Sequence, residues 1–214
     1  MAQIDFLASL YMARKTILYA TQNPAKLETL KNILGPEYTV LSLSDVGISD
    51  QAHEDGASPK ENSIKKARAC FVATGKPCFA MDFGLFIDGI SDAEQPGPHI
   101  KKAVEKVIGH NPTDEEIIEY YSDVIYKLGG KTTAHWLRSF AFSSKDGDFC
   151  DEIKIPKILV STPSKKKFKG FPMISLQFYP ELSKYESEMS PEEKEDIMKT
   201  THDAVREFIN KFST

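Results

Sequence analysis

The spacing of apolar and polar positions predicts a β-α-β unit near the start of the chain. Residues 16–21 (TILYAT) are a short apolar and β-branched run that stops at a polar turn, which is typical of a buried strand. Apolar side chains then recur at helical spacing from Leu27 to Leu34, and Gly35-Pro36 ends the pattern. Residues 38–43 alternate like a second strand. The usual crossover would place the two strands parallel in one sheet.

Strands and helices continue to alternate along the rest of the chain. The pattern predicts helices over 60–74, after Pro98, over 114–128 and from Pro191 to Phe212, and strands over 78–82, 132–142 and 149–160, with 85–89 as an extended continuation of the first of these. We therefore expect an α/β fold with a long, mixed, twisted sheet flanked by helices.

Composition indicates one folded domain with an ordinary core. Of the 214 residues, 41% are hydrophobic and 27% are charged, which are values typical of globular proteins. Residues 1–14 form an N-terminal extension in this interpretation, and residues 15–214 form a single domain. The net charge of −4 has the wrong sign for a domain that binds a nucleic-acid backbone, and it favours a small, locally charged ligand.

Cysteine usage and hydropathy point to a cytoplasmic setting. Cys70, Cys78 and Cys150 form no CxxC motif and cannot all pair, as expected under reducing conditions. No apolar run approaches the ~18 residues that cross a bilayer, so we expect no membrane partner.

The turn after the first strand has the residue types of a phosphate-binding turn. Thr21, Asn23 and Lys26 supply a hydroxyl, an amide and an ammonium between a strand and a helix. Free backbone N–H groups at the helix N-terminus, together with the lysine charge, can hold phosphate. The alternative is a plain capped turn, because Asn and Thr are common helix caps.

Two further segments carry acidic groups. Glu54 precedes a glycine, and Glu61 lies in the helix expected over 60–74, where an ordinary surface pair with Lys65 is the alternative to a functional role. Asp82 ends a run too apolar for a surface strand, and Gly84 is expected to let the backbone turn there. A buried carboxylate must be hydrogen-bonded, paired or metal-bound, so Asp82 is a candidate functional residue.

Taken together, these segments resemble the inosine triphosphate pyrophosphatase family. The matches follow one order over nearly the whole chain, and jointly they are specific although each alone is weak. They are Thr21, Asn23 and Lys26 of T-x-N-x-x-K; Glu54 and Gly56 of E-x-G; Glu61, Asn62, Lys66 and Ala67 of E-N-x-x-x-K-A; Asp82, Gly84 and Leu85 of the acidic pair and S-G-L; residues 96–101 of P-G-x-x-x-K; and residues 185–194 of F-A-E-M-x-x-E-E-K.

The resemblance implies two lobes around a central nucleotide cleft and metal-dependent hydrolysis of inosine or xanthosine triphosphate to the monophosphate and pyrophosphate. Mg²⁺ would be bound by Glu54 and Asp82, and Asp82, with Glu61, would act on the attacking water. The family also implies a homodimer, through the region of residues 96–101. The implied substrate-binding residues are Thr21, Asn23, Lys26, Lys66, Phe171 and Lys194.

The chain departs from the family pattern at the metal and base regions. Met81 stands where the family has a second acidic residue, and Phe83 replaces the Ser of S-G-L. Ile174 occupies the position of an Asp that contacts the purine, and residues 198–200 (MKT) replace S-H-R. The last two departures, at Ile174 and residues 198–200, favour an altered base specificity. They also leave open an alternative, a catalytically weak or inactive nucleotide-binding homologue that acts as a sensor or partner protein.

Overall fold

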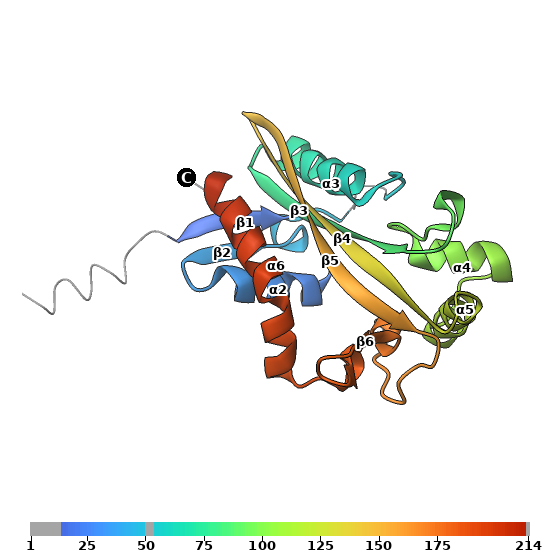
Figure 1. Ribbon diagram of the computed structural model, residues 1–214. Coiled ribbons are helices and arrows are strands. Elements are labelled where there is room, and N and C mark those ends of the chain that lie inside the picture. The colour runs from blue at the N-terminus through green and yellow to red at the C-terminus, as the bar shows by residue number, and fades with distance from the viewer. Residues whose placement is uncertain (1–13, 50–53, 213–214) are drawn as a thin grey trace, which may run out of the picture.

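Seven strands form one twisted mixed sheet in the computed structural model, in the spatial order β2-β1-β3-β4-β5-β6-β7 (Figure 1). The structure describes residues 14–49 and 54–212. β1 pairs in parallel with β2 and with β3, and the later pairings are antiparallel, so the predicted parallel β-α-β start is confirmed. The strands are β1 (Lys15–Tyr19), β2 (Tyr38–Leu41), β3 (Cys78–Ile87), β4 (Lys131–Ser144), β5 (Gly147–Val160), β6 (Gln177–Tyr179) and β7 (Lys184–Tyr185).

The predicted helices are confirmed, and their ends follow from local capping chemistry. Asn23, Ser58 and Thr113 each accept backbone N–H groups at the start of a helix, and Gly35 and Gly75 end two helices. Because these caps satisfy the otherwise unpaired terminal groups, the helix boundaries could be read from the sequence. The helices are α2 (Pro24–Leu34), α3 (Pro59–Thr74), α4 (Ile100–Ile108), α5 (Asp114–Lys127) and α6 (Pro191–Phe212).

Helices cover the sheet in two groups, which we call the first and the second lobe. In the first lobe, α2 and α6 pack on one face of the sheet through residues such as Leu30 and Phe208, and α3 packs on the other face through Ala67 and Cys70. In the second lobe, α4 and α5 pack against the far ends of β3–β5 (Figure 1). The long strands β3, β4 and β5 therefore pass through both lobes.

The expected turn at Gly84 is wrong, because β3 runs unbroken from Cys78 to Ile87. Every residue of β3 pairs with β4, which keeps the chain extended through Gly84. A Cβ at position 84 would lie 2.8 Å from Pro59 Cγ and 3.0 Å from the Gly97 carbonyl carbon. The glycine is therefore needed for the close approach of two segments and not for a bend.

Gly84→Ala should destabilise the fold. Gly97 is held against β3 by two backbone hydrogen bonds with Leu85, of 2.9 and 3.0 Å, so it cannot withdraw from an added methyl group. We expect a loss of about 1–3 kcal/mol, seen as a lower urea midpoint with an unchanged m-value. Val72→Ala, at an exposed position of α3, is the control and should change stability by less than about 0.5 kcal/mol. A midpoint equal to that of the parent would show that the two segments separate easily.

The predicted boundary between an extension (1–14) and a domain (15–214) stays a prediction, since residues 1–13 lie outside the described residues. Within residues 14–49 and 54–212, no helix combines the length and the apolar character that a bilayer crossing requires.

Candidate active site

The candidate site lies where β1 ends and β3 continues beyond it. The parallel pairing of these neighbours stops at Tyr19 and Phe79, so the later residues of β3 extend past the carboxyl end of β1. The N-terminus of α2 and the segment before α3 occupy the space at this point. Ligands of α/β sheets bind at the carboxyl ends of strands, and most of the residues predicted for the site come from these segments.

Lys66 joins two of the predicted acidic residues. Its buried Nζ lies 2.7 Å from Asp82 Oδ1 and 3.1 Å from Glu54 Oε1. Burial opposes ionisation of Glu54, but the attraction of Lys66 and its hydrogen bond outweigh burial and lower the pKa of the Glu54 carboxyl. The structure thus brings together three residues that are far apart in the sequence.

Asn62 holds the other oxygen of Asp82. Its Nδ2 donates to Asp82 Oδ2 at 3.1 Å, and its Oδ1 accepts the Gly56 N–H at 2.8 Å. A Cβ at Gly56 would lie only 2.6 Å from Asn62 Oδ1, so the glycine allows this contact. Asn62 therefore orients the Asp82 carboxylate relative to the segment that carries Glu54. The sequence motif contained Asn62, but its link to Asp82 depends on the packing of α3 against β3.

Glu61 lies at the start of α3, where its Oε2 accepts the Ala57 N–H at 2.9 Å. It makes no hydrogen bond to Asp82 in the described part of the chain, and its catalytic role stays a prediction. Lys65, the expected surface partner of Glu61, forms its ion pair with Asp55 instead, at 2.9 Å between Lys65 Nζ and Asp55 Oδ1.

Thr21 and Asn23 shape the turn that precedes α2. Thr21 Oγ1 accepts the Asn23 N–H at 3.1 Å, and Asn23 Oδ1 accepts the Ala25 N–H at 2.9 Å. These contacts are those of a capped turn, and the phosphate-binding roles of both residues stay predictions. Burial and the positive charge of Lys66 lower the pKa of the Lys26 ammonium.

A cavity of about 520 Å³ is lined by Met81 and Phe83, the residues on either side of Asp82 in β3, and extends to α6. Glu54, Lys66 and Asp82 are not among its lining residues. Asn23 and Lys26 lie at one part of its wall, and the predicted substrate-binding residues Phe171 and Lys194 lie at another. Phe171 is 59% exposed, so its ring is available for stacking. The cavity is lined by Asn23, Ala25, Lys26, Thr29, Asn32, Met81, Phe83, Arg138, Phe171, Glu186, Pro191, Lys194, Glu195, Ile197, Met198 and His202.

The α6 wall of the cavity includes His202, which the sequence shows only as displaced from the S-H-R position and which was not predicted as a site residue. Lys194, Met198 and His202 all line the cavity. They are spaced by four residues on one helix and so share one face, and this helical spacing could have identified His202. Lys199 and Thr200 are exposed and do not line the cavity. Ile174 lines a separate cavity of about 340 Å³ instead.

Two further wall residues, Phe83 and Arg138, also were not predicted as site residues. They are direct partners in the β3–β4 register, so their side chains project on the same face of the sheet. Lys26 Nζ and Arg138 Cζ lie 5.3 and 4.9 Å from the centre of the Phe83 ring. Burial lowers the pKa of the Arg138 guanidinium to about 10, against the opposing effects of Tyr19 and Glu186.

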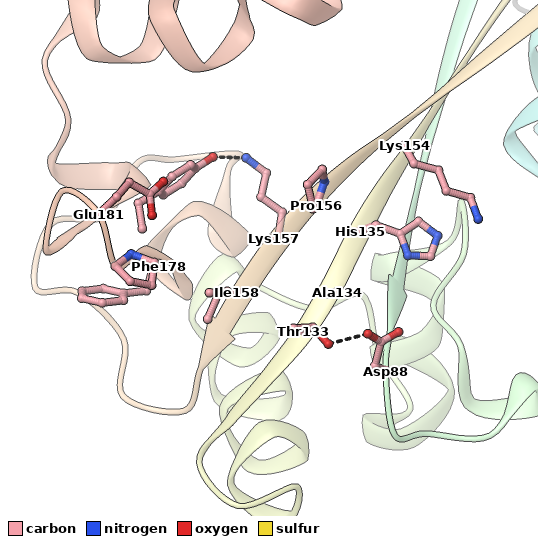
Figure 2. Close-up of a pocket in the computed structure, with 12 residues that line it drawn as sticks. Asp88, Thr133, Ala134, His135, Lys154, Pro156, Lys157, Ile158, Phe178 and Glu181 are labelled. Carbon is pink, nitrogen blue, oxygen red and sulfur yellow. Dashed lines mark hydrogen bonds between the residues drawn. The ribbon is translucent and has the colours of Figure 1, made fainter.

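A second cavity, of about 460 Å³, lies over β4 and β5 and contains none of the predicted site residues. Two of its polar side chains have partners: Thr133 donates to Asp88 (Figure 2), and Lys157 Nζ lies 2.8 Å from Glu186 Oε2. Because the predicted residues Asn23, Lys26, Phe171 and Lys194 all line the cavity of about 520 Å³, we assign the site to that cavity.

Comparison with known proteins identifies the family of this chain and several relatives. The sequence model of the Ham1 family matches residues 17–211, which is most of the chain. The chain belongs to the Ham1 family. The relatives of this Ham1 family member include a dITP/XTP pyrophosphatase of Thermoanaerobacter sp. (strain X514), which is 26% identical over 182 residues, or 85% of this chain and 88% of that protein.

One further sequence relative and one solved structure show how much of the chain is similar to known proteins. A dITP/XTP pyrophosphatase of Bacillus subtilis (strain 168) is 40% identical over 77 residues, which is 36% of this chain and only 39% of that protein. The solved Ham1 protein of Staphylococcus aureus superposes with a TM-score of 0.73 at 23% identity, covering 92% of this chain and 99% of that one. The α/β fold of this Ham1 family member is thus the fold of a Ham1 protein of known structure.

Glu54 and Asp82 are the side chains of this Ham1 family member that could help to hold a magnesium ion bound to a ligand. In residues 14–49 and 54–212, no group of three or more His, Cys, Asp or Glu side chains could hold a metal alone. Glu54 and Asp82 both contact the same Lys66 nitrogen and so lie close together. Mg²⁺ in phosphate-binding sites is held by one or two carboxylates, and the substrate phosphates supply further oxygens.

Proposed function

We propose that this chain hydrolyses nucleoside triphosphates of the inosine or xanthosine type to the monophosphate and pyrophosphate. The observation that carries the proposal is the contact of Lys66 with both Glu54 and Asp82, near a cavity of about 520 Å³ whose wall includes Lys26 and the two β3 neighbours of Asp82. That volume is within the range of small-molecule sites. Carboxylates beside two ammonium groups suit a polyphosphate that reacts with water. The names of the relatives and membership of the Ham1 family support the same conclusion.

Each of these residues has a distinct part in the proposed reaction. Lys26 and Lys66 place point charges against the phosphate oxygens and fix the chain of phosphates. Asp82, oriented by Asn62, accepts a proton from the attacking water at a carboxylate oxygen. The water oxygen bonds to the α-phosphorus as the bond to the bridging oxygen breaks, and pyrophosphate leaves. A magnesium ion held by Glu54 and Asp82 would supply charge neutralisation of the phosphates.

The alternative function is nucleotide binding with weak or absent hydrolysis. It is favoured by Met81 and Phe83, which put a thioether and a phenyl ring next to Asp82 along β3 in place of a carboxylate and a hydroxyl. In the structure both oxygens of Asp82 already have hydrogen-bond partners, Lys66 and Asn62. A sensor or partner protein could retain the cavity without the turnover.

A panel of nucleoside triphosphates with Mg²⁺, scored for pyrophosphate release, distinguishes the two functions. Inosine, xanthosine, adenosine and guanosine triphosphates each go through the assay and through a calorimetric binding measurement. Release of pyrophosphate from one or more of them supports the enzyme. Tight binding of a nucleotide without release supports the alternative, and neither binding nor release contradicts both. Omitting Mg²⁺ tests the metal requirement.

We further propose that the protein is a cytoplasmic homodimer that contacts neither nucleic acid nor membrane. The three cysteines are free thiols, as expected in a reducing compartment. Light scattering at micromolar concentration should give twice the chain mass of 24.0 kDa. A mass of one chain would contradict the dimer, and substitutions in residues 96–101 test the expected interface.

A further inference from the structure

Arg138 lies in the cavity wall and forms no salt bridge among the residues that the structure describes, although Glu186 lines the same cavity. Its Nε is buried and has no hydrogen-bond partner, and its guanidinium forms no ion pair with any acidic group in residues 14–49 and 54–212. Two other buried cations are satisfied: Lys66 contacts Glu54 and Asp82, and Lys157 contacts Glu186. A buried donor without an acceptor is unfavourable, so this arrangement indicates that a ligand completes it.

Phe83 fixes the orientation of Arg138 and leaves its donors available. The phenyl ring lies 4.9 Å from Arg138 Cζ and covers part of the guanidinium by a cation–π contact. The N–H groups of a guanidinium lie in its plane, so a ring against its face does not consume them. Residues 83 and 138 are paired on adjacent strands, which makes the side-chain placement rigid. Arg138 is thus held in a position where it can bind an oxygen anion with two parallel hydrogen bonds.

The surroundings of Arg138 favour phosphate as the ligand. Lys26 Nζ lies 5.3 Å from the same Phe83 ring, so two cations flank one aromatic side chain in the cavity wall. Lys26 and Arg138 also line the same cavity. A chain of phosphates that contacts Lys26 therefore passes close to Arg138, whereas the stacking residue Phe171 comes from a loop beyond β5.

We propose that Arg138 is a substrate-binding residue whose guanidinium donates hydrogen bonds to phosphate oxygens of the nucleotide, with Phe83 as its positioning residue. This inference rests on the proposed function and deepens it, since it names a residue outside the motifs that define the site.

The test uses inorganic tripolyphosphate as a probe, because it carries the phosphate chain without a base. Calorimetry should show that Arg138→Met weakens tripolyphosphate binding at least tenfold. The control is Arg68→Met, at an exposed arginine of α3 that pairs with Asp148, and it should bind like the parent within twofold. Without ligand, Arg138→Met should melt no lower than the parent, because methionine packs against an aromatic ring and removes an unpaired charge. An arginine with a purely structural role would instead give a lower melting temperature and unchanged binding.

Two further measurements could refute the proposal. Arg138→Lys retains the charge but not the planar pair of donors, so its affinity should fall between those of the parent and Arg138→Met. Inosine, which has no phosphate, should bind Arg138→Met and the parent equally. The proposal is overturned if the parent does not bind tripolyphosphate, if Arg138→Met binds it like the parent, or if only inosine binding is lost. If binding behaves as expected but no triphosphate is hydrolysed, the proposed enzymatic function fails while this inference stands.

Discussion

Asp82→Asn should lower the rate of pyrophosphate release by about 10²-fold or more, the usual scale of a general acid or base contribution. The amide cannot accept the proton of the attacking water, and it removes one of the two negative charges next to Lys66. The Asn62 contact, at 3.1 Å, and the Lys66 contact, at 2.7 Å, both involve oxygens of this carboxylate. The substitution therefore affects the orientation of the group as well as its basicity.

Asp88→Asn is the matched control for this experiment. Asp88 directly follows β3, but it lines the second cavity and accepts from Thr133. Its substitution should leave turnover within about twofold of the parent, on the scale of a surface change. Thermal unfolding of both variants shows whether lost activity reflects lost structure, since removing one partner of a buried ion pair is also destabilising. Hydrolysis of every triphosphate by Asp82→Asn at the parental rate would show that the catalytic assignment is wrong.

We expect the kcat/KM for inosine triphosphate to have no large advantage over the values for adenosine and guanosine triphosphates. A site built to hydrogen-bond a substrate group rejects analogues without that group by factors of about 10⁴–10⁵. Here Ile174 lies in another cavity, and Met198, which does line the site, offers no strong hydrogen bond. Phe171 can stack on any base. We therefore expect kcat/KM values for inosine, xanthosine, adenosine and guanosine triphosphates to lie within about 10³ of one another.

The opposite result would point to a particular residue. A preference of a thousandfold or more for inosine or xanthosine triphosphate would mean that another side chain reads the base. His202 would be the first candidate, because it lines the cavity four residues after Met198 and carries ring nitrogens that can donate or accept. His202→Ala should then abolish the preference. Phe171→Leu is the control, since loss of stacking should lower kcat/KM for all four nucleotides together.

The sequence predicted the elements better than the contacts between them. Helix limits followed from caps such as Asn23 and Thr113 and from the glycines after α2 and α3, because these signals act within one turn. The turn expected at Gly84 was wrong because the reason for that glycine, the approach of Pro59 and Gly97, lies outside its own neighbourhood in the sequence. The charged group of Lys66, Glu54 and Asp82 could be proposed only through the family resemblance.

Arg138 shows most clearly what the sequence could not indicate. It belongs to no motif, and its strand reads as an ordinary run of alternating residues. Its importance comes from the register that pairs it with Phe83 and from the absence of an acidic partner within the described residues. Both are properties of the assembled sheet, and neither has a signature in the local order of residues.

The continuity of β3, β4 and β5 through both lobes limits how the molecule can move. β4 and β5 are each 14 residues long and pair along their whole length, so these strands join the lobes without a loop between them. Hinge closure relies on a few loop or terminal residues that absorb large dihedral changes, whereas relative motion here would require bending a hydrogen-bonded ladder. Small-angle scattering should therefore show nearly the same radius of gyration with and without nucleotide. We then expect conformational changes on ligand binding to be confined to the turn before α2 and the loop that carries Phe171, while the sheet keeps its shape.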